Sequence, residues 1–152
     1  MAESNYRGQM TMEEMLAFLD EKPRPDHSSY LVFTSMGPRG YPHSVPLSYF
    51  RVGEELIMGA RVGTQKLRNI ERDPRVSISL ESGATVATLR GLMMQGDARV
   101  VTEMPDLFEL TLEGARQRGT PEAELPTEPR PGTAYIRVTP RRWITWDYSK
   151  PR

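Results

Sequence analysis

Apolar residues near the start of the chain recur at the spacing of one helix face, and this predicts a helix over residues 12–21. The residues concerned are Met12, Met15, Leu16 and Leu19. Thr11 and Glu14 match a capping box at the start of this helix. Pro23 and Pro25 follow its end and would stop it.

After the first helix, the apolar period changes to two, which is typical of strands. Residues 30–34 and 43–50 are rich in β-forming side chains, and the turn signal Gly37-Pro38-Arg39-Gly40 separates them, so 29–50 is predicted to form a hairpin. Further strands are predicted at 56–60, 76–80, 91–101 and 133–138, and 141–146 is a candidate extension of the sheet.

Two more segments have the pattern of helices. Residues 64–72 form a short one, with Thr64 as a candidate N-cap and Pro74 just beyond its end. Residues 104–115 form a second amphipathic helix, which Gly119 would terminate.

Six or seven short strands joined mostly by turns predict a mainly β protein of the α+β type, with one antiparallel sheet and peripheral helices. A sheet with this many strands in a small domain tends to close into a barrel. The 152 residues are expected to form one domain over 1–152. We expect residues 1–10 to be flexible, and 120–132, which hold four prolines, to form an ordered or mobile surface loop.

Composition excludes several classes of function. Equal numbers of acidic and basic residues, 20 each, argue against general nucleic-acid binding and against a polybasic membrane anchor. No apolar run approaches the ~20 residues that span a bilayer, and the first ten residues lack a signal core, so a cytoplasmic protein is expected. The absence of cysteine excludes disulfides, thiolate catalysis and cysteine-ligated metal centres.

The charges are nevertheless unevenly distributed along the chain. Residues 61–75 carry five basic side chains and two acidic ones, and residues 130–152 carry six basic and one acidic. The segment 103–128 between them is acidic, with seven carboxylates and two arginines. Two basic segments in a neutral chain indicate a local anion site.

The most specific local feature is a strand, turn and helix over residues 56–74. A helix opening at Thr64, Gln65 and Lys66 would offer unpaired N–H groups and the positive end of its dipole to an anion. Lys66 and Arg61 would add positive charge, and Thr64 a hydroxyl, so a phosphate would be well held. The alternative is an ordinary capped surface helix with solvated cations.

The second candidate is the segment 40–46, where short side chains and two prolines would let a flat ligand lie close to the backbone. His43 could hydrogen-bond a ring carbonyl. Alternatively, Pro42 and Pro46 simply protect an edge strand. His27 is interpreted as a surface-loop residue.

The third candidate is aromatic. Trp143, Trp146 and Tyr148 lie near Arg141 and Arg142, and could cover a planar ligand by stacking. Packing of the tryptophans in the core or at an interface is at least as good an interpretation.

Other chemistries find no support in the motifs. The chain has no nucleophile elbow, no HExxH, no GxGxxG and no P-loop, and its two histidines lack metal-ligand spacing. A hydrolytic triad, a metal site and a Rossmann nucleotide site are therefore not expected.

The residues quoted above resemble the pyridoxamine 5'-phosphate oxidase-like split β-barrel superfamily. The likeness covers roughly residues 12–147, and its specific part is 66–76, which reads K-x-x-N-I-x-R-D-P-R-V; residues 40–46 add G-x-P-x-x-x-P. The chain looks closest to the flavin/deazaflavin oxidoreductase branch, which uses FMN or the deazaflavin coenzyme F-420. It lacks the R-x-V-L-L-K strand of true pyridoxamine-phosphate oxidase, so vitamin B6 oxidation is not expected.

This resemblance implies a six-stranded antiparallel split β-barrel and a homodimer with two equivalent cofactor sites at the subunit interface. Three groups of residues would form each site. Lys66 and Asn69 would hold the phosphate, with Arg61, Thr64 and Gln65 nearby; Pro42, His43, Ser44 and Val45 would lie beside the ring; Gly59 and Ala60 would line the cleft by their backbone.

The sequence thus leads to three hypotheses. The first is an oxidoreductase that transfers a hydride between bound FMN or deazaflavin and a small conjugated substrate such as a quinone or enone. The second is a barrel that binds or sequesters a flavin, deazaflavin or haem without catalysis, and the third is a structural dimer without cofactor. The cluster Arg68, Arg72 and Arg75 could receive the acidic tail of the deazaflavin, which slightly favours that cofactor.

Overall fold

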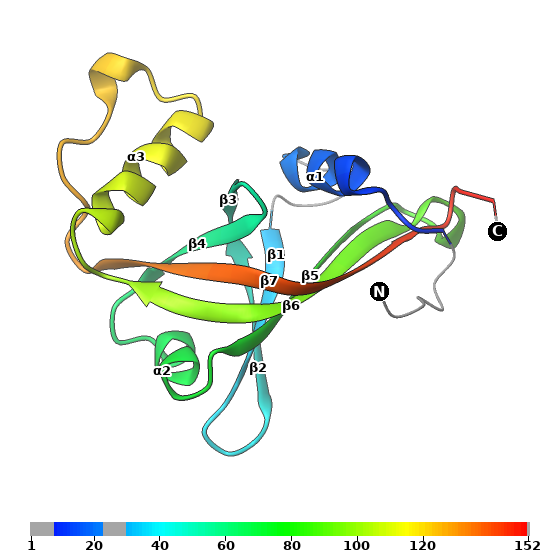
Figure 1. Ribbon diagram of the computed structural model, residues 1–152, viewed down its shortest axis with the longest axis horizontal. Helices are drawn as coiled ribbons and strands as arrows, with labels where there is room; N and C mark the ends of the chain where they lie inside the picture. The colour runs from blue at the N-terminus through cyan, green and yellow to red at the C-terminus, as the bar shows by residue number, and fades with distance from the viewer. Residues whose placement is uncertain (1–7, 23–29, 152) are drawn as a thin grey trace.

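The computed structural model describes residues 8–22 and 30–151 (Figure 1). The proposed flexibility of residues 1–7, the helix stop at Pro23 and Pro25, and the loop assignment of His27 lie outside the described residues. Gly8–Met10 belong to the segment predicted to be flexible, yet the backbone N–H of Met10 donates to Thr145 Oγ1 at 2.9 Å. This bond holds the segment against the last strand.

The described residues form seven strands, three α-helices and two short 3-10 turns. The helices are α1 (Met12–Asp20), α2 (Gln65–Arg72) and α3 (Asp106–Gln117), and the 3-10 turns are η1 (Val86–Thr88) and η2 (Glu122–Glu124). The strands are β1 (Tyr30–Met36), β2 (Pro42–Ser48), β3 (Phe50–Val52), β4 (Glu55–Arg61), β5 (Arg75–Ser82), β6 (Arg90–Val101) and β7 (Thr133–Asp147).

All strand pairs are antiparallel, and the strands follow the order β2-β1-β5-β6-β7-β4-β3. The two edge strands, β2 and β3, are separated in sequence by the single residue Tyr49. One residue spans at most ~3.6 Å. The sheet must therefore curl until its edges meet, and this makes the predicted split barrel.

The strand count is seven, whereas the resemblance implied six. The run 43–50 was predicted as one strand, but it divides at Tyr49 into β2 and the three-residue β3. The extension over 141–146 is confirmed, because β7 continues past Pro140 to Asp147. Opposite Pro140, the register of β6 shifts between Gln95 and Gly96, which accommodates a residue that has no N–H to donate.

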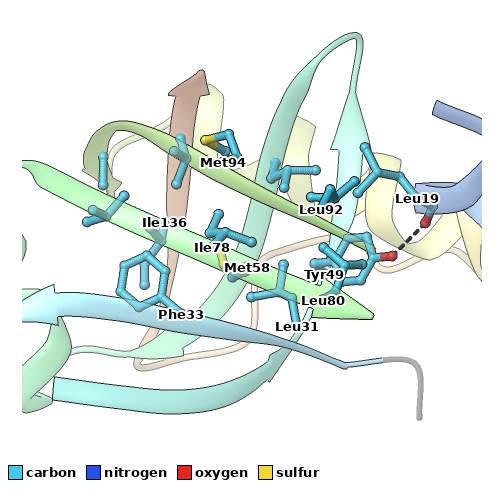
Figure 2. Close-up of a cluster of buried hydrophobic side chains, with 14 of the residues drawn as sticks. Leu19, Leu31, Phe33, Tyr49, Met58, Ile78, Leu80, Leu92, Met94 and Ile136 are labelled. Atoms are coloured by element: carbon cyan, nitrogen blue, oxygen red, sulfur yellow. Dashed lines mark hydrogen bonds between the residues drawn. The ribbon is translucent and has the colours of Figure 1, made fainter. Parts of the chain in front are cut away.

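The core fills the inside of the curled sheet (Figure 2). Side chains that alternate between the two faces of each strand produce this core. Along β1, Leu31, Phe33 and Ser35 are buried while their neighbours are more exposed. Helix α1 covers one end of this core, and the Tyr49 hydroxyl donates to the Leu19 carbonyl at 2.6 Å (Figure 2). The capping box predicted at Thr11 is confirmed.

A second, smaller apolar cluster lies on the outer face of β4. There Ile57 packs with Phe50, Val101 and Leu110, the last from α3. Helix α3 and the proline-rich segment 120–132, which contains η2, project together beyond the end of the sheet (Figure 1). Strand β4 is therefore covered on both faces, by the core inside and by α3 outside. No helix among the described residues has the length and apolar character that crossing a membrane requires.

Candidate functional site

The predicted strand, turn and helix at residues 56–72 are present. Strand β4 ends at Arg61, Gly63 turns the chain with a φ of 80°, and α2 begins at Gln65. Thr64 occupies the N-cap position, but its side chain does not cap the helix; the hydroxyl donates to the Arg61 carbonyl at 2.9 Å. The first N–H groups of α2 therefore keep their donor capacity for a ligand.

Two cations lie beside this helix start. Lys66 is half-buried and Arg61 is exposed, and neither forms an ion pair within the described part of the chain. Arg68 instead turns back, and its Nη2 donates to the Gly63 carbonyl at 2.8 Å. Unpaired positive charge next to free helix N–H groups is a good chemical match for a phosphate.

Asn69 lies inside the protein, away from the surface of the helix start. It is fully buried; its Nδ2 donates to Ser35 Oγ at 3.1 Å, and its Oδ1 accepts from Gln65 Nε2 at 2.7 Å. Both amide side chains are therefore engaged in bonds that join α2 to itself and to β1. In this arrangement Asn69 and Gln65 position the helix start.

The four predicted ring contacts on β2 divide between the two faces of the strand. Pro42 and Ser44 are exposed, and Ser44 shares a hydrogen bond of 2.8 Å with Thr34. His43 and Val45 point the other way, and Val45 packs against the core. The Nδ1 atom of His43 is buried, and nothing in the described residues offers it a hydrogen bond.

Gly59 and Ala60 also face opposite sides, because they are neighbours on β4. Ala60 packs against the core, while Gly59 lies on the outer face, where a Cβ would stand 3.9 Å from the Tyr135 ring. Gly59 lines a groove of about 1030 Å³ between α3 and the outer face of β3, β4 and β7. Thr133 lines it too, and Thr133 is the register partner of Arg61 on β4, so the groove extends to the part of the sheet that carries this cation.

A second groove of about 800 Å³ lies over the outer face of β1, β5 and β6, and Pro42 lines it. Its arginines are largely engaged: Arg75 pairs with Asp73 at 2.8 Å, and Arg72 donates to the Met36 carbonyl at 2.5 Å. The Arg75 hydrogen bond lowers the pKa of Asp73 to about 2. The arginine cluster proposed for an acidic tail is thus mostly committed to partners within the protein.

The two tryptophans do not form a shared stacking surface. Trp143 packs against the core, whereas Trp146 lies over Gly91, where a Cβ would stand only 2.8 Å from the indole ring. The aromatic residues that line the groove beside α3 are Tyr49, Phe50 and Tyr135, which come from the residue before β3, from β3 and from β7, respectively. Sequence reasoning missed them, because Tyr135 is distant in the chain from Tyr49 and Phe50 and the three residues follow no common period.

Comparison with known proteins agrees with the fold described above. A family model described as Pyridoxamine 5'-phosphate oxidase matches residues 11–147. Among curated proteins, none matches the sequence.

Solved structures share the fold. A conserved hypothetical protein from Mycobacterium tuberculosis is 25% identical, with a TM-score of 0.79, over 97% of this chain and 91% of that one. An F420 reductase is 23% identical, with a TM-score of 0.59, over 84% of this chain and 94% of that one. A pyridoxamine 5'-phosphate oxidase-related, FMN binding protein from Nostoc punctiforme is 17% identical, with a TM-score of 0.60, over 78% and 74%.

Proposed function

Since this chain belongs to the pyridoxamine 5'-phosphate oxidase family, we propose that it is an oxidoreductase that binds FMN or a deazaflavin of the coenzyme F-420 type. Its substrate would be a small conjugated organic molecule such as a quinone or an enone. One observation carries the proposal: Arg61 and Lys66 stand without ion-pair partners, among the described residues, at a helix start whose N–H groups are uncapped.

The phosphate of the cofactor would bind at this helix start. The side chains of Arg61 and Lys66 and the first N–H groups of α2 would hold it by charge-assisted hydrogen bonds. Thr64 fixes the turn through its bond to the Arg61 carbonyl, and Asn69 and Gln65 fix the helix from inside.

The ring would lie between β2 and β4. These strands approach each other where the barrel closes, and Ser48 and Gly59 line the same groove. Residues 42–45 would contact the ring mainly through their backbone, because their side chains alternate between two faces. A bound flavin or deazaflavin supplies the chemistry of hydride transfer. The protein therefore has to hold the substrate close to the ring and exclude water from the site, and it does not need to provide an acid–base pair.

We also propose that the site is completed in a cytoplasmic homodimer. Large apolar side chains stand exposed on the outer face of β1: Tyr30, Val32 and Met36. Thr34 lies between Val32 and Met36 on this face, and the three exposed apolar side chains around it support an interface. Light scattering coupled to gel filtration measures the mass; a monomer at micromolar concentration would contradict this part of the proposal.

Titration of the purified protein with FMN and with coenzyme F-420 tests the proposed function. We expect one of them to bind at micromolar concentration or below, and its reduced form to reduce members of a quinone and enone panel under anaerobic conditions. Tight binding without turnover would make the chain a cofactor-sequestering protein. Binding of neither cofactor would overturn the proposal.

A further inference from the structure

We propose that the groove between α3 and the outer face of β4 and β7 is the substrate site, and that it selects planar conjugated molecules carrying a carboxylate. The reaction assigned to this site rests on the proposed function; the binding preference does not. Three features carry the inference: aromatic walls, an unpaired arginine, and the connection of the groove to the cofactor region.

The walls of the groove favour a flat ligand. Tyr135 and Phe50 meet edge to face, with ring centroids 6.1 Å apart and an interplanar angle of 81°. Gly114 lets α3 approach this pair, because a Cβ there would stand 3.0 Å from the Phe50 ring. Gly59 leaves the strand side of the groove open beside Tyr135. A conjugated ring can therefore stack beside Tyr135, in the space that Gly59 leaves free.

The charge of the groove favours an anion. Among the described residues that line the groove, the single acidic one is Asp20, which forms a bidentate ion pair with Arg51, at 2.7 Å for each contact. Arg118, the C-cap residue of α3, has no carboxylate partner within the described residues, although Arg116, two residues earlier, pairs with Glu122 at 3.4 Å. A carboxylate matches the planar fork of an unpaired guanidinium.

Arg118 also lies where two cavities join. A further cavity of about 740 Å³ lies beneath the proline-rich segment, and it shares Arg118, Thr133 and Tyr135 with the groove. Toward the barrel, the groove reaches Gly59 and also Thr133, the register partner of Arg61. A substrate with its carboxylate on Arg118 would thus extend its conjugated part toward the proposed cofactor site.

Binding of 2-naphthoate, compared with the neutral 2-naphthamide, tests the proposal by calorimetry on the protein without cofactor. We expect the unsubstituted chain to prefer the carboxylate at least tenfold. Arg118→Gln should weaken 2-naphthoate about tenfold, equal to about 1.4 kcal/mol, and leave 2-naphthamide unchanged. Arg116→Gln is the matched control, because Arg116 is exposed in the last turn of α3. This variant should leave the affinity for both ligands unchanged.

Equal affinity for the two probes in the unsubstituted chain would overturn the proposal without recourse to any variant. The proposal would also be overturned if Arg118→Gln and Arg116→Gln changed the affinity for 2-naphthoate equally. FMN and coenzyme F-420 should bind Arg118→Gln as they bind the unsubstituted chain; if this variant loses the cofactor, the groove belongs to the cofactor and not to the substrate. Failure of the proposed function has a different signature, in which naphthoate binds but neither cofactor does.

Discussion

The side-chain amide of Asn69 donates to the hydroxyl of Ser35 at 3.1 Å, so a bond inside the protein fastens α2 to β1. The same amide accepts from Gln65, the first residue of α2, at 2.7 Å. The position of the proposed phosphate site is thus set by buried polar contacts, and not by the charged residues that would touch the ligand.

Asn69→Ala is expected to lower the free energy of unfolding by about 1–3 kcal/mol, because it leaves Ser35 without its partner and opens a small cavity. Denaturation by urea measures the change. Ser35→Ala is the comparison: it removes one bond and preserves the contact with Gln65, so its loss should be smaller. Wild-type stability in Asn69→Ala would show that the contact contributes little.

Lys66→Ala is expected to weaken binding of the preferred cofactor by about 1.5–3 kcal/mol, the scale of a charge-assisted hydrogen bond. Arg116→Ala is a suitable control, because Arg116 is exposed on α3 and already pairs with Glu122. Fluorescence titration gives both dissociation constants. An unchanged constant for Lys66→Ala would remove this side chain from the site.

Glu55→Gln tests an ion pair that joins β4 to β7. Arg137 Nη2 lies 2.7 Å from Glu55 Oε1, and Thr139 donates to Oε2 at 3.0 Å. The Arg137 hydrogen bond lowers the pKa of Glu55 below its ordinary value of 4.5. The carboxylate therefore stabilises the fold above pH 4.5, and this contribution is lost as the pH falls through the lower folded value.

At pH 7 we expect Glu55→Gln to lower the free energy of unfolding by about 1 kcal/mol, since the ion pair with Arg137 is only partly buried. The difference in the free energy of unfolding between this variant and the unsubstituted chain should shrink toward pH 3. Urea titrations at pH 7 and pH 3 would measure it. Glu54→Gln alters an exposed neighbour and should have no effect at either pH. A difference that grows on acidification would contradict the assigned direction.

Gly91→Ala is expected to destabilise the sheet by about 1–3 kcal/mol through overpacking. The added Cβ would stand 2.7 Å from the Leu80 carbonyl oxygen and 2.8 Å from the Trp146 ring. Thermal unfolding followed by tryptophan fluorescence gives the loss. Gly59→Ala makes the same chemical change at a position where the added Cβ would stand 3.9 Å from the Tyr135 ring, an ordinary van der Waals contact. Its midpoint temperature of unfolding should be close to that of the unsubstituted chain.

Local patterns predicted the elements well where a period or a turn signal ran for several residues. The capping box at Thr11 and the alternation over 76–80 are examples, and both are present. The three-residue β3 was missed, because no period can be read from so short a run. Tyr49 gives no local sign that it separates two strands, since its role depends on the closure of the barrel.

The candidate site was foreseen only in part. Gly63 and Lys66 belong to one short segment, so their proximity follows from the sequence itself. The groove draws its lining from α1, β2, β3, β4, α3 and β7, and such a gathering depends on tertiary packing. Asn69 illustrates the same limit, because a polar residue in a charged helix gives no indication that its side chain is buried.

The position of β7 has a consequence for the order in which the molecule is made. This strand lies between β6 and β4, yet it follows every other strand in the sequence. A growing polypeptide on the ribosome must therefore carry Leu56, Ile57 and Met58 on a hairpin that still lacks its main neighbour. Contacts between distant parts of a chain slow folding, so the sheet can close only after β7 is available to pair with both β6 and β4.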